Sequence, residues 1–167
     1  KARLYSEHLK GATYPAYNQS RYLEALKALD ERQVVAVNLL APLARAAQDA
    51  NKTELYYRTD THWNQRGAKL AAQAISKQVA ALKLDIARTE FSTMADTTPQ
   101  ERPGDLIRLM GLENVPNTLR PRPDREAPEV TSEKDAQKSG QGLFGESSVP
   151  VVLTGTSYSM RGNFHGY

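Results

Sequence analysis

Hydrophobic residues along this chain occur in two arrangements, spaced as on a helix face or gathered in short continuous runs. Residues 20–29 show the helical spacing, with Ser20 as a candidate cap and apolar side chains at Tyr22, Leu23, Leu26 and Leu29. Residues 34–40 (VVAVNLL) are short, apolar and rich in β-branched side chains, which favours a strand buried on both faces. Pro42 is well placed to open a second helix through about residue 50.

The second half of the chain repeats this alternation more weakly. Residues 55–57 suggest a brief strand, and the longest helix should follow it, with Asn64 as its cap. A short helix is expected after Gly104. Residues 116–148 combine proline, glycine and charge, so we expect a long surface loop or insertion there. Residues 149–154 (VPVVLT) read as a second buried strand.

Strands that alternate with helices predict an α/β sandwich with a mostly parallel central sheet. Functional groups of such folds gather just beyond the carboxyl ends of the strands. Asp60 and His62 come just after the expected strand at 55–57, and Ser157 comes just after the one at 149–154. The pattern therefore predicts that these three side chains lie at one edge of the sheet.

Composition limits the classes of protein to which the chain can belong. Its 167 residues, 40% hydrophobic and 25% charged, fit a single domain that can bury a core. The 22 basic and 19 acidic residues leave a surplus of 22 − 19 = 3, which is too small and too dispersed for a nucleic-acid-binding surface. The absence of cysteine excludes disulfides and thiolate chemistry, and no apolar run is long enough to cross a bilayer.

Ser157 is the candidate nucleophile. A serine hydroxyl needs a base to accept its proton and usually a third group to orient that base. Gly155 allows a tight turn after the expected strand, and the backbone N–H groups of Ser157 and Tyr158 could then face an oxyanion. The alternative is a serine that caps an ordinary strand-to-helix connection, and the pentapeptide 155–159 alone favours that alternative.

Asp60 and His62 are the candidate orienting carboxylate and base. A carboxylate two residues before an imidazole can accept a hydrogen bond from its Nδ1–H and leave Nε2 free to face a nucleophile. The alternatives are a capping aspartate with a core histidine, or a metal site. Neither His8 nor His165 has metal-type spacing to His62, so we predict no metal and no cofactor.

Three further aromatic or basic side chains stand near these motifs. His165 is expected on the helix that follows Ser157, pointing away from it, and is therefore not the predicted base. Trp63 and Tyr158 are candidate substrate-binding side chains. A lone tryptophan beside a helix start is as often part of the core, and both readings of Trp63 stay open.

The two motifs resemble those of a known family. DTHWNQRGAKLAA, residues 60–72, resembles the Asp-x-His block of SGNH hydrolases, and GTSYS, residues 155–159, resembles their serine block. The reversed order of the blocks, with YYRTDTHW and VVLTGTSYS, is typical of alginate O-acetyltransferases of the AlgJ/AlgX type. The resemblance covers residues 1–82 and 149–167, with a looser match at 104–106.

This resemblance implies an SGNH hydrolase-like three-layer sandwich, present here as an incomplete domain. It implies a periplasmic protein, anchored to the inner membrane through a segment absent from this chain, with Asp60, His62 and Ser157 as its triad. It would move acetyl groups onto an exopolysaccharide such as alginate, and a membrane acyltransferase partner would pass on the acetyl donor. The alternatives are a carbohydrate acetylesterase and a non-catalytic polysaccharide-binding domain of the same fold.

Overall fold

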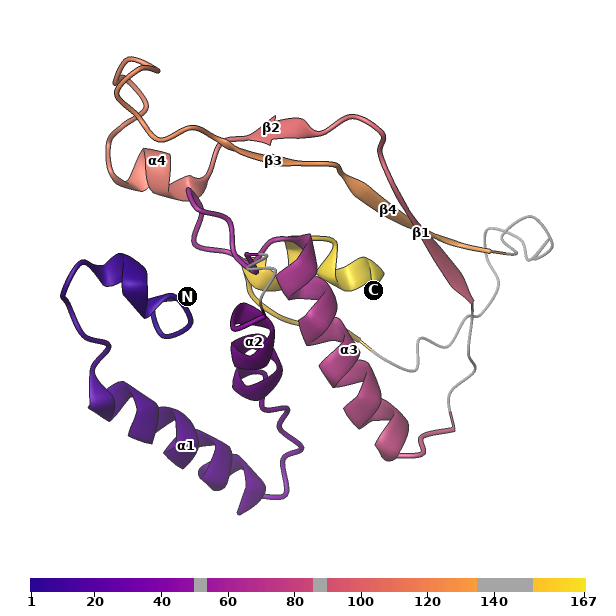
Figure 1. Ribbon diagram of the computed structural model, residues 1–167. Coiled ribbons are helices and arrows are strands. Elements are labelled where there is room, and N and C mark those ends of the chain that lie inside the picture. The colour runs from indigo at the N-terminus through magenta and orange to yellow at the C-terminus, as the bar shows by residue number, and fades with distance from the viewer. Residues whose placement is uncertain (50–53, 86–89, 135–151) are drawn as a thin grey trace.

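The computed structural model describes residues 1–49, 54–85, 90–134 and 152–167 (Figure 1). The N-terminal part contains a short 3₁₀ turn, η1 (Ser6–Leu9), and two helices, α1 (Ala16–Asp30) and α2 (Leu40–Ala47). The longest helix, α3 (Gln65–Ala81), packs against α2. Asn64 caps α3 by accepting a hydrogen bond from the N–H of Gly67 at 3.0 Å, as the sequence predicts.

Both sheets that the described residues form are two-stranded and antiparallel. β1 (Phe91–Ala95) pairs with β4 (Glu129–Glu133), with Phe91 opposite Glu133 and Ala95 opposite Glu129. β2 (Gln100–Arg102) pairs with β3 (Asp124–Glu126), with Arg102 opposite Asp124. Together they form a long ribbon that arches over α3 and the C-terminal segment, with α4 (Asp105–Leu109) near the far end of the ribbon (Figure 1).

The structure differs from the sequence-based expectation at both predicted buried strands. Residues 34–39 have no regular structure, and Val34 and Val35 are 50% and 54% exposed. Residues 152–155 are likewise irregular, whereas 149–151 lie outside the described residues. A buried parallel strand needs a neighbouring strand for its backbone hydrogen bonds. No described strand lies beside either segment, so their apolar composition alone does not make them strands and the predicted parallel sheet is not formed by the described residues.

The prediction that residues 116–148 form a long surface loop is also partly wrong. β3 and β4 occupy part of it, because their residues find partners in β2 and β1, which lie far away in the sequence. The remainder from residue 135 lies outside the described residues. The helix expected from Ser20 begins four residues earlier, at Ala16, after Pro15. The short helix expected after Gly104 is confirmed as α4.

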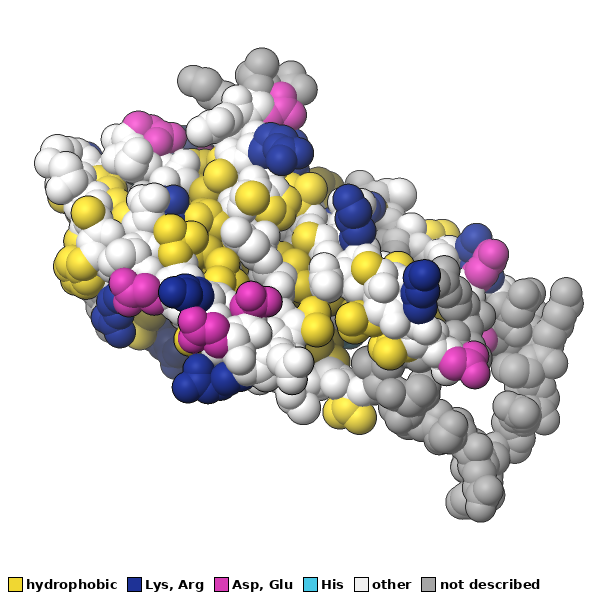
Figure 2. Space-filling view, turned by 90° about the horizontal axis from the view of Figure 1, so that it is seen from below, with side chains coloured by type: hydrophobic (Ala, Val, Ile, Leu, Met, Phe, Trp, Pro, Cys, Tyr) yellow, Lys and Arg dark blue, Asp and Glu magenta, His cyan; other side chains and the backbone are white. Residues whose placement is uncertain are grey.

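The core is small and lies beneath the N-terminal half of α3. Trp63, Ala68 and Ala71 form its buried cluster, and the partly buried hydrophobic residues that pack against it are Leu39, Tyr56, Tyr158, Phe164 and Tyr167. Other hydrophobic side chains reach the surface, and Figure 2 shows them gathered over the middle of one face. None of the helices within the described ranges is both long and apolar enough to span a membrane.

Two glycines allow the close approaches on which the site depends. A Cβ on Gly104 would lie 1.8 Å from the carbonyl oxygen of Thr59, and one on Gly67 would lie 2.2 Å from that of Leu55. Such distances are far below van der Waals contact, so neither position has room for a side chain. Gly104 thereby sets α4 directly against the residues around Asp60.

Candidate active site

The segment between Leu55 and Asn64 folds back on itself. Tyr56 and Trp63 form an antiparallel bridge, and the N–H of Asn64 donates to the carbonyl oxygen of Leu55 at 3.0 Å. The N–H of Tyr57 donates to the carbonyl oxygen of His62 at 3.3 Å. The turn of this small loop carries Asp60 and His62, and α3 begins immediately after it, so the loop is fixed at both ends.

Asp60 and His62 form a buried, doubly hydrogen-bonded pair. Asp60 is 3% exposed and His62 is 7% exposed. Oδ1 of Asp60 lies 2.5 Å from Nδ1 of the imidazole and accepts the backbone N–H of His62 at 2.9 Å. A carboxylate at this distance requires the proton on Nδ1, which leaves Nε2 as the acceptor. The ring is therefore held in the tautomer that can accept a proton.

Ser157 faces the free ring nitrogen. Its Oγ lies 2.7 Å from Nε2 of His62, a hydrogen bond between residues 95 positions apart in the sequence. Ser157 is exposed and opens η2 (Ser157–Met160), a short 3₁₀ turn capped by Thr156. The structure thus brings Asp60, His62 and Ser157 together, in the spatial order that the sequence predicts.

Trp63 and Tyr158, the two predicted substrate-binding side chains, fasten the serine segment to the core. The indole N–H of Trp63 donates to the carbonyl oxygens of Tyr158 at 3.1 Å and Arg161 at 3.2 Å. The hydroxyl of Tyr158 donates to the carbonyl oxygen of Thr61 at 2.6 Å. Their rings pack edge to face with centroids 5.2 Å apart, and the Tyr158 ring also lies 4.8 Å from that of His62. Trp63 is therefore a core residue that positions Ser157.

Two further carboxylates support the loop. Asp124, on β3, accepts the N–H groups of Arg58 and Thr59, each at 3.0 Å, and the hydroxyl of Thr59 at 2.6 Å. Asp105, on α4, accepts the N–H of Thr61 at 2.8 Å, and its other oxygen lies 3.6 Å from Nδ1 of His62. Sequence reasoning did not single out either side chain for the site, since both lie more than 40 positions from His62. The one signal was the loose match at 104–106.

Hydrogen bonds and nearby arginines keep the buried carboxylates of Asp60 and Asp124 ionised. Burial alone would raise the pKa of Asp60, but the hydrogen bonds from the backbone and ring of His62, with the nearby Arg102, hold its pKa below 3.8. Burial opposes ionisation of Asp124 in the same way, and the hydrogen bonds from Thr59 and Arg58 outweigh it, so its pKa is also lowered from 3.8. Arg102 stands 3.7 Å from Oδ2 of Asp60.

Neither His8 nor His165 is the histidine that contacts Ser157, and one of the two predicted oxyanion donors already has a hydrogen-bond partner. The N–H of Tyr158 already donates to Oγ1 of Thr156, in a long bond of 3.3 Å. His165 lies in η3 (Phe164–Gly166), a second 3₁₀ turn after η2, and the exposed His8 lies in η1. The ring nitrogen that contacts Ser157 belongs to His62.

One cluster among the described residues has the composition of a metal site. Single ligand atoms of Asp60, His62 and Asp105 all lie within 4.8 Å of one another. A cation bound there would displace the Asp60–His62 hydrogen bond and the bonds from Thr61 to Asp105. The candidate ligand atoms are thus already engaged in hydrogen bonds that orient these side chains, which favours proton transfer over metal binding.

Comparison with known proteins gives a consistent match over the whole chain. A family model described as an SGNH hydrolase-like domain, acetyltransferase AlgX, matches residues 1–167. The probable alginate O-acetylases AlgJ of Pseudomonas putida and Pseudomonas aeruginosa are each 33% identical, over 95% and 99% of this chain. These alignments cover 41% and 44% of the relatives, so the chain spans less than half of their length.

A solved structure shares the fold. The O-acetyltransferase domain of Pseudomonas putida AlgJ superposes with a TM-score of 0.79 and 30% identity, covering 99% of this chain and 54% of the other. The predicted fold class, an incomplete SGNH hydrolase-like domain, is therefore confirmed. The chain belongs to the family of SGNH hydrolase-like domains described as acetyltransferase AlgX.

Proposed function

We propose that this chain carries the catalytic groups of an O-acetyltransferase that acts on a polysaccharide. The observation that carries the proposal is the continuous hydrogen-bonded path from Asp60 through His62 to Ser157, with distances of 2.5 and 2.7 Å. Relatives named alginate O-acetylases support acetyl as the transferred group and alginate as the acceptor. Residues 1–167 would form part of a single catalytic domain.

In the first step, Ser157 Oγ attacks the carbonyl carbon of an acetyl donor while Nε2 of His62 takes the hydroxyl proton. The bond between the acetyl group and its carrier breaks, and the carrier leaves with the proton from His62, so that an acetyl-serine ester remains. In the second step, a sugar hydroxyl attacks this ester and gives its proton to His62. Ser157 Oγ departs and recovers that proton, which restores the site.

Asp60 holds the imidazole in the productive tautomer and stabilises the imidazolium formed in each step. Its lowered pKa supports this role, because the carboxylate stays charged throughout the neutral range. Asp105 adds a second negative charge 3.6 Å from Nδ1. Arg102 partly balances the charge of Asp60 and keeps that carboxylate from becoming the proton acceptor.

Hydrolysis is the second candidate reaction. Ser157 is exposed, and water could replace the sugar in the second step, so acetylesterase activity is expected beside transfer. The sequence resemblance supports a periplasmic location and a membrane acyltransferase that supplies the donor. A non-catalytic binding domain would have no use for a serine hydrogen-bonded to an oriented imidazole.

The test is hydrolysis of 4-nitrophenyl acetate by the full-length protein that contains this chain, together with acetyl transfer to mannuronate oligosaccharides. His62→Ala should lower both rates by several orders of magnitude, because the base is lost. His8→Ala is the matched control, since this exposed histidine lies in η1 and should leave both rates unchanged. Equal rates for His62→Ala and the wild type would refute the proposal.

A further inference from the structure

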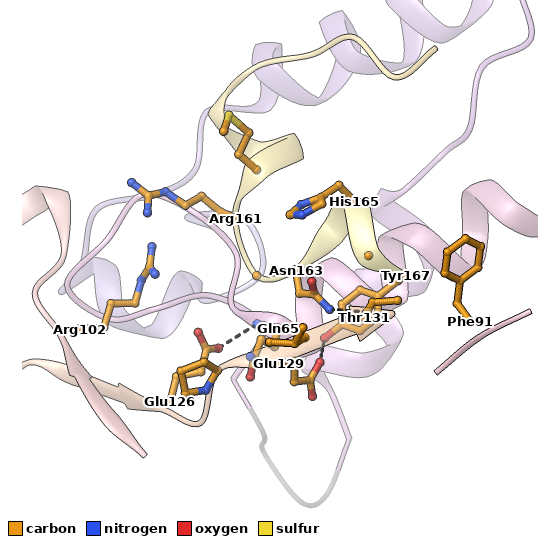
Figure 3. Close-up of a pocket in the computed structure, with 15 residues that line it drawn as sticks. Gln65, Phe91, Arg102, Glu126, Glu129, Thr131, Arg161, Asn163, His165 and Tyr167 are labelled. Carbon is orange, nitrogen blue, oxygen red and sulfur yellow. Dashed lines mark hydrogen bonds between the residues drawn. The ribbon is translucent and has the colours of Figure 1, made fainter. Parts of the chain in front are cut away.

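A cleft of about 660 Å³ lies beside the triad and has no part in the chemistry described above (Figure 3). It is bounded by the start of α3, by β4 and by the turn that follows Ser157, including residues 160–163. Arg102 belongs to both places, since it lines the cleft and stands 3.7 Å from Asp60. A molecule in the cleft would therefore contact a side chain that also stands beside the Asp60 carboxylate.

Two guanidinium groups face each other at one side of this cleft. Arg102 and Arg161 come from β2 and from the turn after η2, and their ends point toward one another in Figure 3. Arg102 stands 3.7 Å from the carboxylate of Asp60, which is already hydrogen-bonded to His62. Within the described ranges, no ion pair joins Arg161 to any carboxylate. Two like charges so placed favour an anionic group between them.

Arg102 also carries an unused hydrogen-bond donor. Its Nε is buried and has no hydrogen-bond partner in the described part of the chain, while its guanidinium lies over the ring of Tyr57, 4.5 Å from the centroid. A buried donor without a partner is costly, and native proteins rarely leave one. The described residues therefore do not complete the hydrogen bonding of Arg102.

The rest of the lining suits a sugar rather than a bare anion. Glu126 accepts the N–H of Gln65 at 3.1 Å and the hydroxyl of Tyr57, and Glu129 accepts the hydroxyl of Tyr167. These carboxylates are held in place, with free lone pairs for sugar hydroxyls. Phe91 and Tyr167 present aromatic rings on the opposite side from the two arginines (Figure 3), which suits the apolar face of a pyranose.

We propose that this cleft binds a uronate unit of the acceptor polysaccharide, with Arg161 and Arg102 gripping its carboxylate. The inference rests on the proposed function, because it assigns the acceptor of that reaction to a specific place. The arginine pair selects a negatively charged sugar over a neutral one of the same shape.

The experiment measures binding of two probes to the full-length protein by calorimetry at low salt. One probe is a mannuronate oligosaccharide, and the other is the same oligosaccharide with its carboxylates reduced to alcohols. The wild type should prefer the acidic probe. Arg161→Gln should weaken binding of that probe by about tenfold or more, and should bring its affinities for the acidic and the reduced probe closer together. Arg21→Gln, the same change on the exposed face of α1, is the control and should bind as the wild type does.

Arg161→Lys separates charge from geometry, because it keeps the positive charge and loses the planar fork of the guanidinium. Its affinity for the acidic probe should therefore fall between those of the wild type and Arg161→Gln. Circular dichroism confirms that each variant is folded. An unchanged preference for the acidic probe in Arg161→Gln would overturn the inference, as would equal binding of both probes by the wild type. Ester hydrolysis by Ser157→Ala reports on the proposed function separately, so either idea can fail without the other.

Discussion

The proposed base and the proposed nucleophile of this site are held in very different ways. Asp60 and His62 are buried in a loop whose backbone is tied to Asp124 and Asp105, on two other elements. Ser157 is exposed, at the start of a four-residue turn that Trp63 and Tyr158 fasten from below. The Asp60–His62 pair is therefore fixed in the interior, whereas the Ser157 hydroxyl stays accessible to substrates.

This difference predicts how each half responds to change. Substitutions around Asp60 should affect both stability and rate, because they leave buried polar groups without partners. Substitutions around Ser157 should affect rate more than stability, since little of that segment is buried. The three predictions below test this contrast, beginning with the largest effect.

Asp60→Asn should reduce ester hydrolysis by roughly a thousandfold or more. The amide cannot accept the Nδ1 proton as a carboxylate does, so the imidazole loses its tautomer and the charge that stabilises its protonated form. Steady-state kinetics with 4-nitrophenyl acetate measures the effect. Asp105→Asn is the matched control, because this carboxylate lies 3.6 Å from Nδ1 rather than 2.5 Å, and its loss should cost far less. Equal losses in the two variants would show that Asp60 has no special place.

Asp124→Asn should destabilise the fold by about 1–3 kcal/mol at neutral pH, because three donors lose a charged acceptor. The folded-state pKa of Asp124 is lowered, so its contribution to stability is complete above the unfolded value of 3.8 and disappears as pH falls through the folded pKa. Urea unfolding at neutral pH and at successively lower pH measures this. The gap between wild type and variant should shrink below pH 3.8, and a gap that widens would contradict the assignment.

Tyr158→Phe should have the smallest effect, a loss of about 1 kcal/mol or less in stability and a severalfold fall in rate. The change removes one hydrogen bond, to the carbonyl oxygen of Thr61, and leaves the ring packed between His62 and Trp63. Thermal unfolding and the same ester assay measure the two quantities. A rate loss as large as that of Asp60→Asn would mean that the hydroxyl itself takes part in the chemistry.

The sequence identified the three side chains that the structure brings into hydrogen-bond contact, but little of the frame around them. Asp60 and His62 are two positions apart, so their geometry follows from local structure, and the serine motif at 155–159 is recognisable when it is taken together with the block at 60–72. Asp124 and Arg102 reach the site through the pairing of β2 with β3, which no local pattern reveals. The apolar run at 34–39 failed as a strand for the same reason, because hydrophobicity does not supply a neighbouring strand.

The role of Trp63 shows the same limit in a single residue. Its position before a helix start was consistent with either a substrate pocket or the core. Only the fold places its indole N–H against the carbonyl oxygens of Tyr158 and Arg161, almost a hundred positions away. The choice between a substrate-pocket role and a core role for Trp63 therefore required the tertiary structure.

Covalent trapping of the acetyl group shows whether Ser157 carries it. The full-length protein is mixed with 4-nitrophenyl acetate, quenched in acid and analysed by peptide mass spectrometry. We expect the mass of one acetyl group on Ser157. This mass should be lost in Ser157→Ala and retained in Ser159→Ala, a matched change in the same turn. Acetylation that persists in Ser157→Ala, or that lies on Ser159 instead, would contradict it.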